Sequence, residues 1–237
     1  MQRYFGLKKE GEYLYLDEND LYHIKTVMRM KENDLVEIVY DNHVYISSLK
    51  NINKNIKFKI EKIEDTTNSI KPYVTLIIPV LKERKLDLIF QKGTELGVDE
   101  FILCPMTRCM VKLENKKTDS KLLRWLNICK EASEQSKRVS IPSVKIVSNF
   151  NEIYSLPGVN FTCSTQEKYN NIKKTLKSLK NCDRINLVIG PEGGLTPLEE
   201  TCLEENNFEK ITLGNQIMRV ETVPLFLMSI INYEYME

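Results

Sequence analysis

The 237-residue sequence lacks several patterns that would assign it to a familiar class. It has only two histidines, and its six cysteines form no C-x-x-C pair, so the sequence indicates neither a zinc site nor a disulfide framework. We interpret these cysteines as reduced thiols. No apolar run is long enough to cross a bilayer, and the first residues do not resemble a secretory signal. We therefore expect a cytoplasmic protein without membrane contact.

The charge balance also lacks a strong sign. Thirty-four basic residues stand against 33 acidic ones, which gives a formal net charge of +1. Bulk charge of this size neither requires nor excludes a nucleic-acid partner, so only local patches can decide. Hydrophobic residues at 42% and charged residues at 28% are typical of a folded globular chain.

The sequence divides into two parts of different pattern. Residues 1–70 contain short, partly alternating strands around one helix in 17–34, which predicts a small β-barrel. That helix should bury a stripe formed by Leu21, Ile24, Val27 and Met28. The polar segment 64–72 reads as a linker. Residues 71–237 alternate strands and helices, which predicts an α/β domain with a mainly parallel sheet. We expect its strands at 73–80, 100–106, 143–147, 159–164, 185–190 and 210–214, and its helices at 84–96, 120–138, 168–179, 197–205 and 221–235.

A glycine-rich corner follows the apolar run INLVI, in the stretch "NLVIGPEGGLTPLEE". Thr196 and Glu199 have the spacing of a capping box, so a helix should begin there. Open α/β sheets bind ligands at such strand ends. However, Pro191 removes a backbone N–H and Glu192 adds a negative charge, which weakens any phosphate cradle. A neutral or cationic ligand fits better, although a simple turn would also explain the glycines.

A second corner lies in "ITLGNQIMRVETVPLFLMSIINYEY". A strand ends at Gly214, and a loop carrying Arg219 and Glu221 leads to the last helix. These two charged residues should lie at the same sheet edge as the first corner. An ion pair between them that caps the last helix is an equally good interpretation of the pattern.

Together the two corners resemble the signature motifs of the SPOUT methyltransferases, and more closely of the RsmE family, which methylates N3 of a uridine in 16S ribosomal RNA. The segments "HIKTVMRMKEND", "LDLIFQKGTELGVDEFILCPMTRC" and "KEASEQSKR" extend the resemblance along the chain. The sequence departs from the family at Asn33, where glycine is usual, and at Val223 and Pro224, where small residues are usual.

The resemblance implies a fold and partners. It implies an N-terminal PUA-like β-barrel over 1–70 and an α/β SPOUT trefoil-knotted methyltransferase domain over 71–237. It also implies S-adenosylmethionine as the methyl donor, a homodimer, and 16S rRNA within the small ribosomal subunit as substrate. The alternatives are a SPOUT methyltransferase acting on a ribose 2'-hydroxyl or on transfer RNA, and a catalytically silent RNA-binding module.

The resemblance also assigns roles to residues. Arg219 would stabilise negative charge on the uracil or fix a neighbouring phosphate, and Glu221 would orient Arg219 or accept the proton. One face of the helix in 120–138 and two further arginines would contact RNA, although an ordinary solvated surface explains the same pattern. These RNA-contacting candidates are Arg29, Arg108, Glu131, Gln135 and Arg138. The cofactor pocket would be formed by Ser164, Gly190, Pro191, Glu192, Gly193, Leu213, Gly214, Ile217 and Met218.

Overall fold

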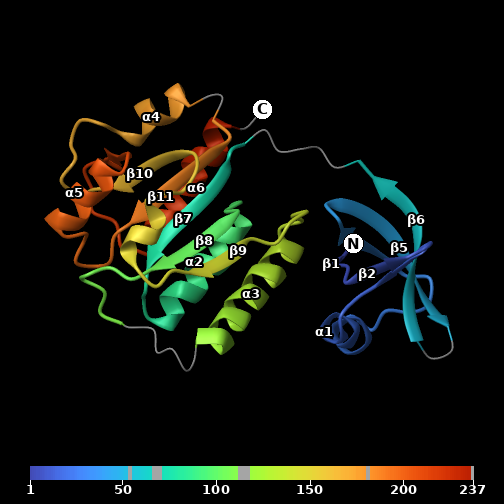
Figure 1. The fold of residues 1–237 in the computed structure, drawn as a ribbon. Helices are drawn as coiled ribbons and strands as arrows, with labels where there is room; N and C mark the ends of the chain where they lie inside the picture. The colour runs from blue at the N-terminus through green and yellow to red at the C-terminus, as the bar shows by residue number, and fades with distance from the viewer. Residues whose placement is uncertain (53–54, 66–70, 112–117, 180–181, 236–237) are drawn as a thin grey trace. The chain divides into compact units, whose positions relative to one another are not determined.

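The computed structural model describes the chain except for residues 53–54, 66–70, 112–117, 180–181 and 236–237 (Figure 1). Two compact units are present. The first consists of Met1–Ser69 with Lys130–Ile141, and the second of Ile70–Cys129 with Pro142–Glu237. Most of the predicted linker 64–72 lies outside the described residues, so a domain boundary at residue 70 stays a prediction.

The first unit is built on a six-stranded sheet in the order β1-β4-β5-β6-β3-β2. Every neighbouring pair is antiparallel except β1 and β4, which run parallel. Among the described residues β1 and β2 form the two ends of the sheet, so the expected barrel is open between them. The strands are β1 (Arg3–Phe5), β2 (Lys8–Glu10), β3 (Tyr13–Tyr15), β4 (Leu35–Tyr40), β5 (His43–Ile52) and β6 (Asn55–Glu64).

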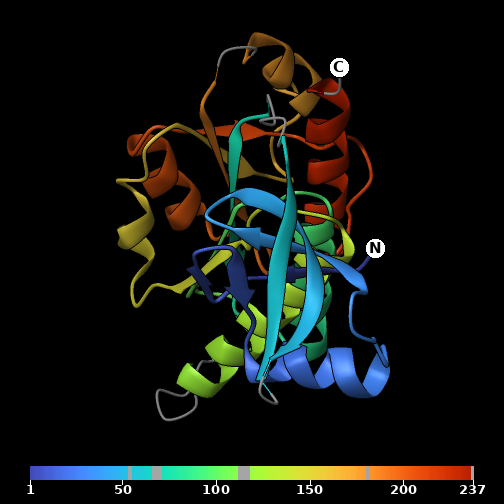
Figure 2. The ribbon, with the colours of Figure 1, turned by 90° about the vertical axis from the view of Figure 1, so that its right-hand side faces the viewer.

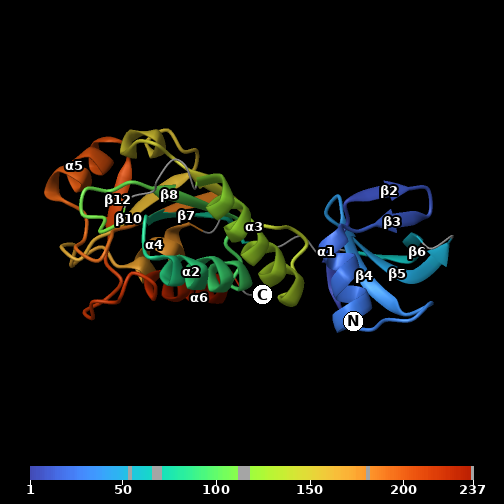
Figure 3. The same ribbon diagram turned by 90° about the horizontal axis from the view of Figure 1, so that it is seen from below.

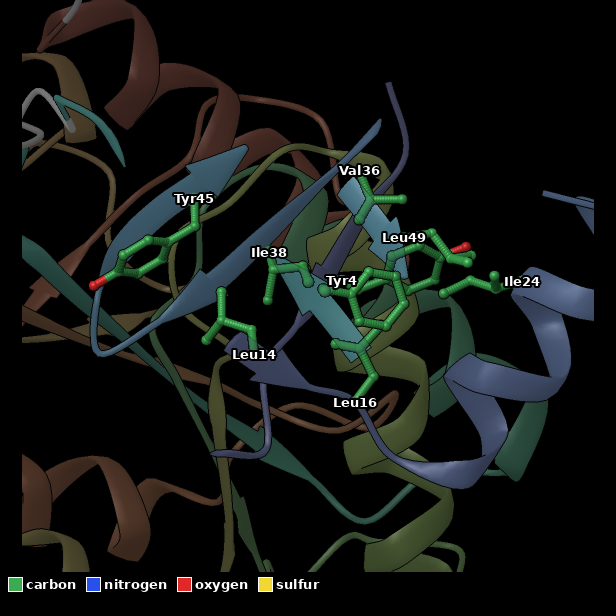
Figure 4. Packing of buried hydrophobic residues seen from close by; sticks show 9 residues of the cluster. Tyr4, Leu14, Leu16, Ile24, Val36, Ile38, Tyr45 and Leu49 are labelled. Atoms are coloured by element: carbon green, nitrogen blue, oxygen red, sulfur yellow. The ribbon is translucent and has the colours of Figure 1, made fainter. Parts of the chain in front are cut away.

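The core of this unit lies between the sheet and its helix. Figure 4 shows Tyr4, Leu14, Ile38 and Leu49 from the strands gathered with Ile24 of the helix, and all five are buried. The alternation of the strands explains this, since Leu14 and Phe58 point inward opposite each other in the register of β3 and β6.

The helix of this unit differs from the expected one. It begins as α1 (Glu18–Tyr22), with Asp17 as its N-cap, and continues as the π-helix η1 (His23–Val27). Ile24 is buried as predicted, but Val27 is 60% exposed and Met28 is 44% exposed. A π-helix turns less per residue than an α-helix, so the predicted stripe rotates away from the core.

The second unit contains a fully parallel six-stranded sheet in the order β12-β10-β11-β7-β8-β9. Its inner strands β7 and β8 are almost entirely buried, as their continuous apolar runs predict. The strands are β7 (Tyr73–Pro79), β8 (Glu100–Cys104), β9 (Ser143–Ile146), β10 (Val159–Cys163), β11 (Arg184–Ile189) and β12 (Phe208–Ile211).

Helices cover both faces of this sheet. Figures 2 and 3 show α2 and α6 side by side on one face and α5 on the opposite face, and the contacts between α2 and α6 agree. The helix that we expected over 168–179 begins only at Ile172, where Asn171 supplies the N-cap. The helices are α2 (Glu83–Glu95), α3 (Thr118–Gln135), α4 (Ile172–Ser178), α5 (Pro197–Glu205), α6 (Val223–Glu234) and the 3₁₀-helix η3 (Phe150–Ile153).

None of the helices within the described residues has both the length and the apolar character that crossing a membrane requires.

Candidate active site

The carboxyl ends of three neighbouring strands are level. In the parallel register, Cys163 at the end of β10 pairs with Ile189 of β11 and with Ile211 of β12. The chain therefore leaves the sheet at one edge in all three places, and both glycine corners begin there, as the rule for open α/β sheets predicts. The structure thus brings together the two motifs that the sequence separates by about 20 residues.

The first corner is a tight turn in which the N–H of Gly194 donates to the carbonyl of Pro191 at 2.8 Å. Gly190 is tightly packed, because a Cβ there would lie 3.0 Å from the backbone nitrogen of Leu195 and would require the backbone to shift. Gly194 has a φ of 69°, which favours glycine. Pro191 is buried, whereas Glu192 and Gly193 are exposed, so the tip of the turn is open to a ligand.

Arg108 holds this corner from a second loop. Its guanidinium donates to the carbonyl of Gly193 at 2.8 Å and to that of Leu195 at 3.0 Å. The resemblance assigned Arg108 to RNA contact, and that role stays a prediction. The structure adds that part of its hydrogen-bonding capacity fixes the backbone of the corner.

The predicted capping box begins helix α5. Thr196 Oγ1 accepts from the N–H of Glu199 at 3.2 Å, and Glu199 Oε2 accepts from the N–H of Thr196 at 2.8 Å. The other carboxylate oxygen of Glu199 accepts from the N–H of Thr107 at 2.7 Å. Burial raises the pKa of Glu199, but these hydrogen bonds outweigh it and hold the pKa below its usual value. Glu199 therefore joins the first corner to the end of β8 as a carboxylate.

The second corner follows β12, which ends at Ile211, three residues before the end that we expected. Gly214 has a φ of 116°, a backbone conformation that L side chains rarely adopt. The side chain of Ile217 is 85% exposed, and Leu213 and Met218 are half-buried. An exposed large apolar side chain beside an open turn can pack against a ligand.

The last helix begins at Val223, with Thr222 as its N-cap and Pro224 in its first turn. The carbonyl of Arg219 accepts from the N–H groups of Thr222 and Val223 at 2.8 and 3.2 Å. The proline departure thus costs no backbone hydrogen bond, because the first-turn N–H groups of a helix have no intrahelical partner.

The charged residues of the second corner do not pair with each other. Glu221 instead lies against Lys85 of α2, with 3.0 Å between Lys85 Nζ and Glu221 Oε2. The same nitrogen lies 3.0 Å from Glu192 Oε1 of the first corner. Arg219 is exposed, and within the described part of the chain its side chain forms no ion pair. The alternative of an Arg219–Glu221 cap is therefore wrong.

The sequence interpretation missed Lys85. The sequence places Lys85 in the first turn of the helix that follows β7, but only the structure shows that β7 is a direct neighbour of β11 in the sheet. The first turn of that helix must lie at the same edge as the corner after β11. An amphipathic pattern alone marks such a lysine only as solvated.

The electrostatics of the two carboxylates follow from Lys85. Burial raises the pKa of Glu192 and of Glu221, but hydrogen bonds to backbone and the ammonium of Lys85 outweigh it, so both pKa values lie below the usual range. The positive charge of Arg219 also lowers the pKa of Glu221. The hydrogen bond that Lys85 donates to Glu192 and the negative charges of both carboxylates raise the pKa of Lys85. Glu192, Glu221 and Lys85 are therefore all charged at neutral pH.

Ser164 lies at the end of β10 and is buried. Its hydroxyl donates to Glu200 Oε1 at 2.8 Å, and its N–H donates to the carbonyl of Ile211 at 3.0 Å. The side chain is thus engaged with α5, and only the neighbouring backbone could form the wall of the pocket that the resemblance assigns to it.

The remaining RNA-contacting candidates belong to the first unit. Arg29 is exposed, with a φ of 51°, directly after the π-helix. Glu131 and Gln135 are exposed on α3, and half-buried Arg138 follows the helix, where its Nε donates to the carbonyl of Ser140 at 3.3 Å. Their contact with RNA stays a prediction.

A cavity of about 580 Å³ adjoins the first turn of α2. Its walls include Lys82, Lys85, Lys121 and Trp125. None of the residues that we assigned to the cofactor lines this cavity, and we place the candidate site at the two corners because the strand register brings them together there.

Comparison with known proteins agrees with this architecture. The family model described as an RNA methyltransferase domain matches residues 68–232, and the model described as an RNA methyltransferase PUA domain matches residues 16–61. The "Ribosomal RNA small subunit methyltransferase E" of Bacillus subtilis (strain 168) is 35% identical, with 99% of this chain and 97% of the relative covered. The protein of the same name from Mesomycoplasma hyopneumoniae (strain 232) is 32% identical over 97% of this chain and 98% of its own length.

A solved structure extends the comparison. The crystal structure of a ribosomal RNA small subunit methyltransferase E from Neisseria gonorrhoeae, bound to S-adenosyl methionine, has a TM-score of 0.82 at 25% identity. The match covers 98% of the present chain and 97% of the gonococcal chain. The parallel sheet of the second unit is therefore SPOUT-like and the sheet of the first unit is PUA-like, as the resemblance implies. The chain belongs to the RsmE family of RNA methyltransferases.

Proposed function

We propose that this protein transfers a methyl group from S-adenosylmethionine to N3 of a uridine in 16S rRNA of the small ribosomal subunit. The observation that carries this proposal is the level ending of β10, β11 and β12, which places both glycine corners at one sheet edge beside an unpaired Arg219. The names of the full-length relatives support the substrate, and the S-adenosyl methionine in the gonococcal structure supports the donor.

The residues present fit this donor. S-adenosylmethionine supplies an electrophilic methyl group on a cationic sulfonium, and it carries no phosphate. The two corners offer open backbone at Gly193 and Gly214, with the carboxylates of Glu192 and Glu221 beside it. Such a site suits a cation better than a nucleotide phosphate. Leu213, Ile217 and Met218 supply apolar contact area for the adenosine.

The nucleophile needs assistance because N3 of uracil is protonated at neutral pH. Arg219 is exposed at the corner and is free to stabilise the anion that forms when this proton leaves. Glu221 is a poor proton acceptor, since its pKa lies below the usual range of a carboxyl. We assign to Glu221 an electrostatic role that keeps the charge of the corner fixed.

The rest of the chain binds and positions RNA. Arg29, Glu131, Gln135 and Arg138 lie on the first unit, where the two arginines would contact phosphates and orient the substrate without reading its sequence. We propose that the protein acts in the cytoplasm on the assembled particle and that it does so as a homodimer. Large apolar side chains are exposed on the second unit, such as Tyr233 at 76%. This supports a dimer in which the partner covers them.

Two measurements test the proposal. Calorimetry should detect binding of S-adenosylmethionine to the purified protein, and no binding at saturating protein would refute an active enzyme and leave the silent RNA-binding module. Mass mapping of 16S rRNA from a strain lacking the gene should show loss of one N3-methyluridine. Its persistence, with loss of a methyl group from a ribose or from transfer RNA, would assign another target.

A further inference from the structure

One ammonium group lies between the two corners of the candidate site. Lys85 occupies the first turn of α2, and its side chain is 28% exposed. It donates a hydrogen bond to Glu192 at 3.0 Å. Glu221 Oε2 lies at the same distance, but it is buried and without hydrogen-bond alignment, so this contact is an ion pair alone.

The arrangement connects segments that are distant in sequence. Glu192 belongs to the turn after β11 and Glu221 to the loop before α6, and neither strand nor helix hydrogen bonds join these two positions directly. Because each carboxylate oxygen lies 3.0 Å from the same nitrogen, the two oxygens are no more than about 6 Å apart. Two carboxylates at that distance repel each other unless a cation lies between them.

We propose that Lys85 is a positioning residue that fixes the spacing of the two cofactor corners and compensates one of their two carboxylates. This inference rests on the proposed function, since it concerns the same methyl-donor site. One ammonium cannot neutralise both Glu192 and Glu221, so carboxylate charge remains to attract a cationic sulfonium. The ammonium also reduces the repulsion that would otherwise move the two corners apart. The alternative is that Lys85 forms an ordinary, partly exposed ion pair, which contributes little to stability and does not affect which ligand binds.

The charge of the ligand separates these interpretations. S-adenosylmethionine and its product S-adenosylhomocysteine have nearly the same shape, but only the first carries the sulfonium charge. A change in the net charge of the corners must therefore change the ratio of the two affinities. A defect in folding or packing lowers the affinity for both ligands by the same factor, so the ratio of the two affinities does not change.

The experiment is calorimetry of both ligands with the full chain and its variants. Lys85→Met leaves two uncompensated carboxylates, so both affinities should fall, and the preference for S-adenosylmethionine over S-adenosylhomocysteine should rise about fivefold. Glu192→Gln removes one carboxylate and should shift the preference in the opposite direction. Lys85→Arg keeps the cation and should retain most of the wild-type preference. Lys92→Met, which removes an ion pair to Glu95 on the same helix, is the matched control.

The outcomes are distinct. An unchanged ratio in both Lys85→Met and Glu192→Gln, whether the affinities themselves are unchanged or uniformly weaker, would overturn the role of Lys85 while the proposed function stands. If the wild-type protein binds neither ligand, the proposed function falls and the inference falls with it. Should Lys85→Met fail to fold, Glu192→Gln still decides, because its substitution lies on an exposed turn.

Discussion

At the scale of single residues, the site is organised by which carboxylate pairs with which cation. Lys85 is the partner of Glu221, and this leaves Arg219 exposed at the mouth of the corner. An arginine that already served as a helix cap would have fewer donors to offer a substrate. An arginine without an ion pair keeps five donors in a planar fork that suits uracil oxygens or a phosphate.

The first prediction concerns this arginine. Arg219→Ala should reduce the single-turnover rate of methylation by at least about 100-fold, because it removes a donor that acts on developing negative charge. Its affinity for S-adenosylmethionine, measured by calorimetry, should stay close to wild type. Lys173→Ala, which removes an exposed cation of α4 in the same unit, is the control. Methylation at the wild-type rate would remove Arg219 from the mechanism.

A second residue-scale prediction concerns Glu134 of α3, which is only 8% exposed. Burial raises its pKa to about 8, and Asp20 adds to this against the opposing charge of Lys130. The carboxyl is therefore protonated in the folded protein at neutral pH, whereas the unfolded chain ionises near the usual 4.5. Because the unfolded state binds fewer protons in this window, the free energy of unfolding falls as pH rises from about 4.5 to 8.

Glu134→Gln mimics the protonated carboxyl and should remove this contribution. The difference in unfolding free energy between variant and wild type should rise with pH by up to about 1.4 kcal/mol per unit between pH 6 and 8. Urea denaturation at each pH measures it. Gln135→Ala, at an exposed position of the same helix, changes no ionisable group and should give a difference that does not change with pH. A flat difference for Glu134→Gln would show that its carboxyl is ionised in the fold.

At the scale of elements, the first glycine corner shows how a short pattern fixes a local structure. The predicted helix start at Pro197 is exact because Thr196 and Glu199 satisfy each other's backbone N–H groups. Thr196→Ala should lower the free energy of unfolding by about 1 kcal/mol, measured by chemical denaturation. Thr201→Ala, at an exposed position within the same helix, is the matched control and should change it much less. Equal losses would mean that the box does not stabilise α5.

The elements that the sequence predicts poorly share a physical cause. The π-helix at His23–Val27 reads as an ordinary amphipathic helix, because Leu21, Ile24 and Met28 have α-helical spacing. All three residues of the strand β2 (Lys8–Glu10) are exposed, so it has no apolar pattern from which the sequence could predict it. By contrast, the buried strands β7, β8 and β11 are predicted within a residue or two, because burial on both faces forces a continuous apolar run.

Only part of the site could be predicted from the sequence. The two corners could be placed at one sheet edge from the alternation of strands and helices. The contact between Lys85 and both corners could not, because it depends on the order of strands in the sheet, and β7 precedes β11 by about 110 residues in the sequence. The threading of the C-terminal segment that the family implies is likewise invisible to periodicity, which records burial and not the path of the chain.

At the scale of the whole molecule, the chain consists of two units, each with its own sheet. In the proposed function, the second unit binds the methyl donor and the first unit contacts RNA. A ligand that binds only the folded state stabilises the segments that form its site. The corners and α2 lie in the second unit, whereas β4, β5 and β6 of the first unit contribute nothing to the proposed donor site. Donor binding should therefore slow amide exchange in the segments that form the site, and not in the first unit.

Hydrogen exchange with mass spectrometry tests this division. Addition of saturating S-adenosylmethionine should slow amide exchange at 190–195 and 213–222, because ordering of open turns raises the free energy of local opening. Exchange in β4–β6, from Leu35 to Glu64, should not change. Lys85→Met should show less protection at both corners together, since the two are held by one cation. Protection that extends into β4–β6 would contradict the division, because it would require the donor site to be coupled to the folding of the first sheet.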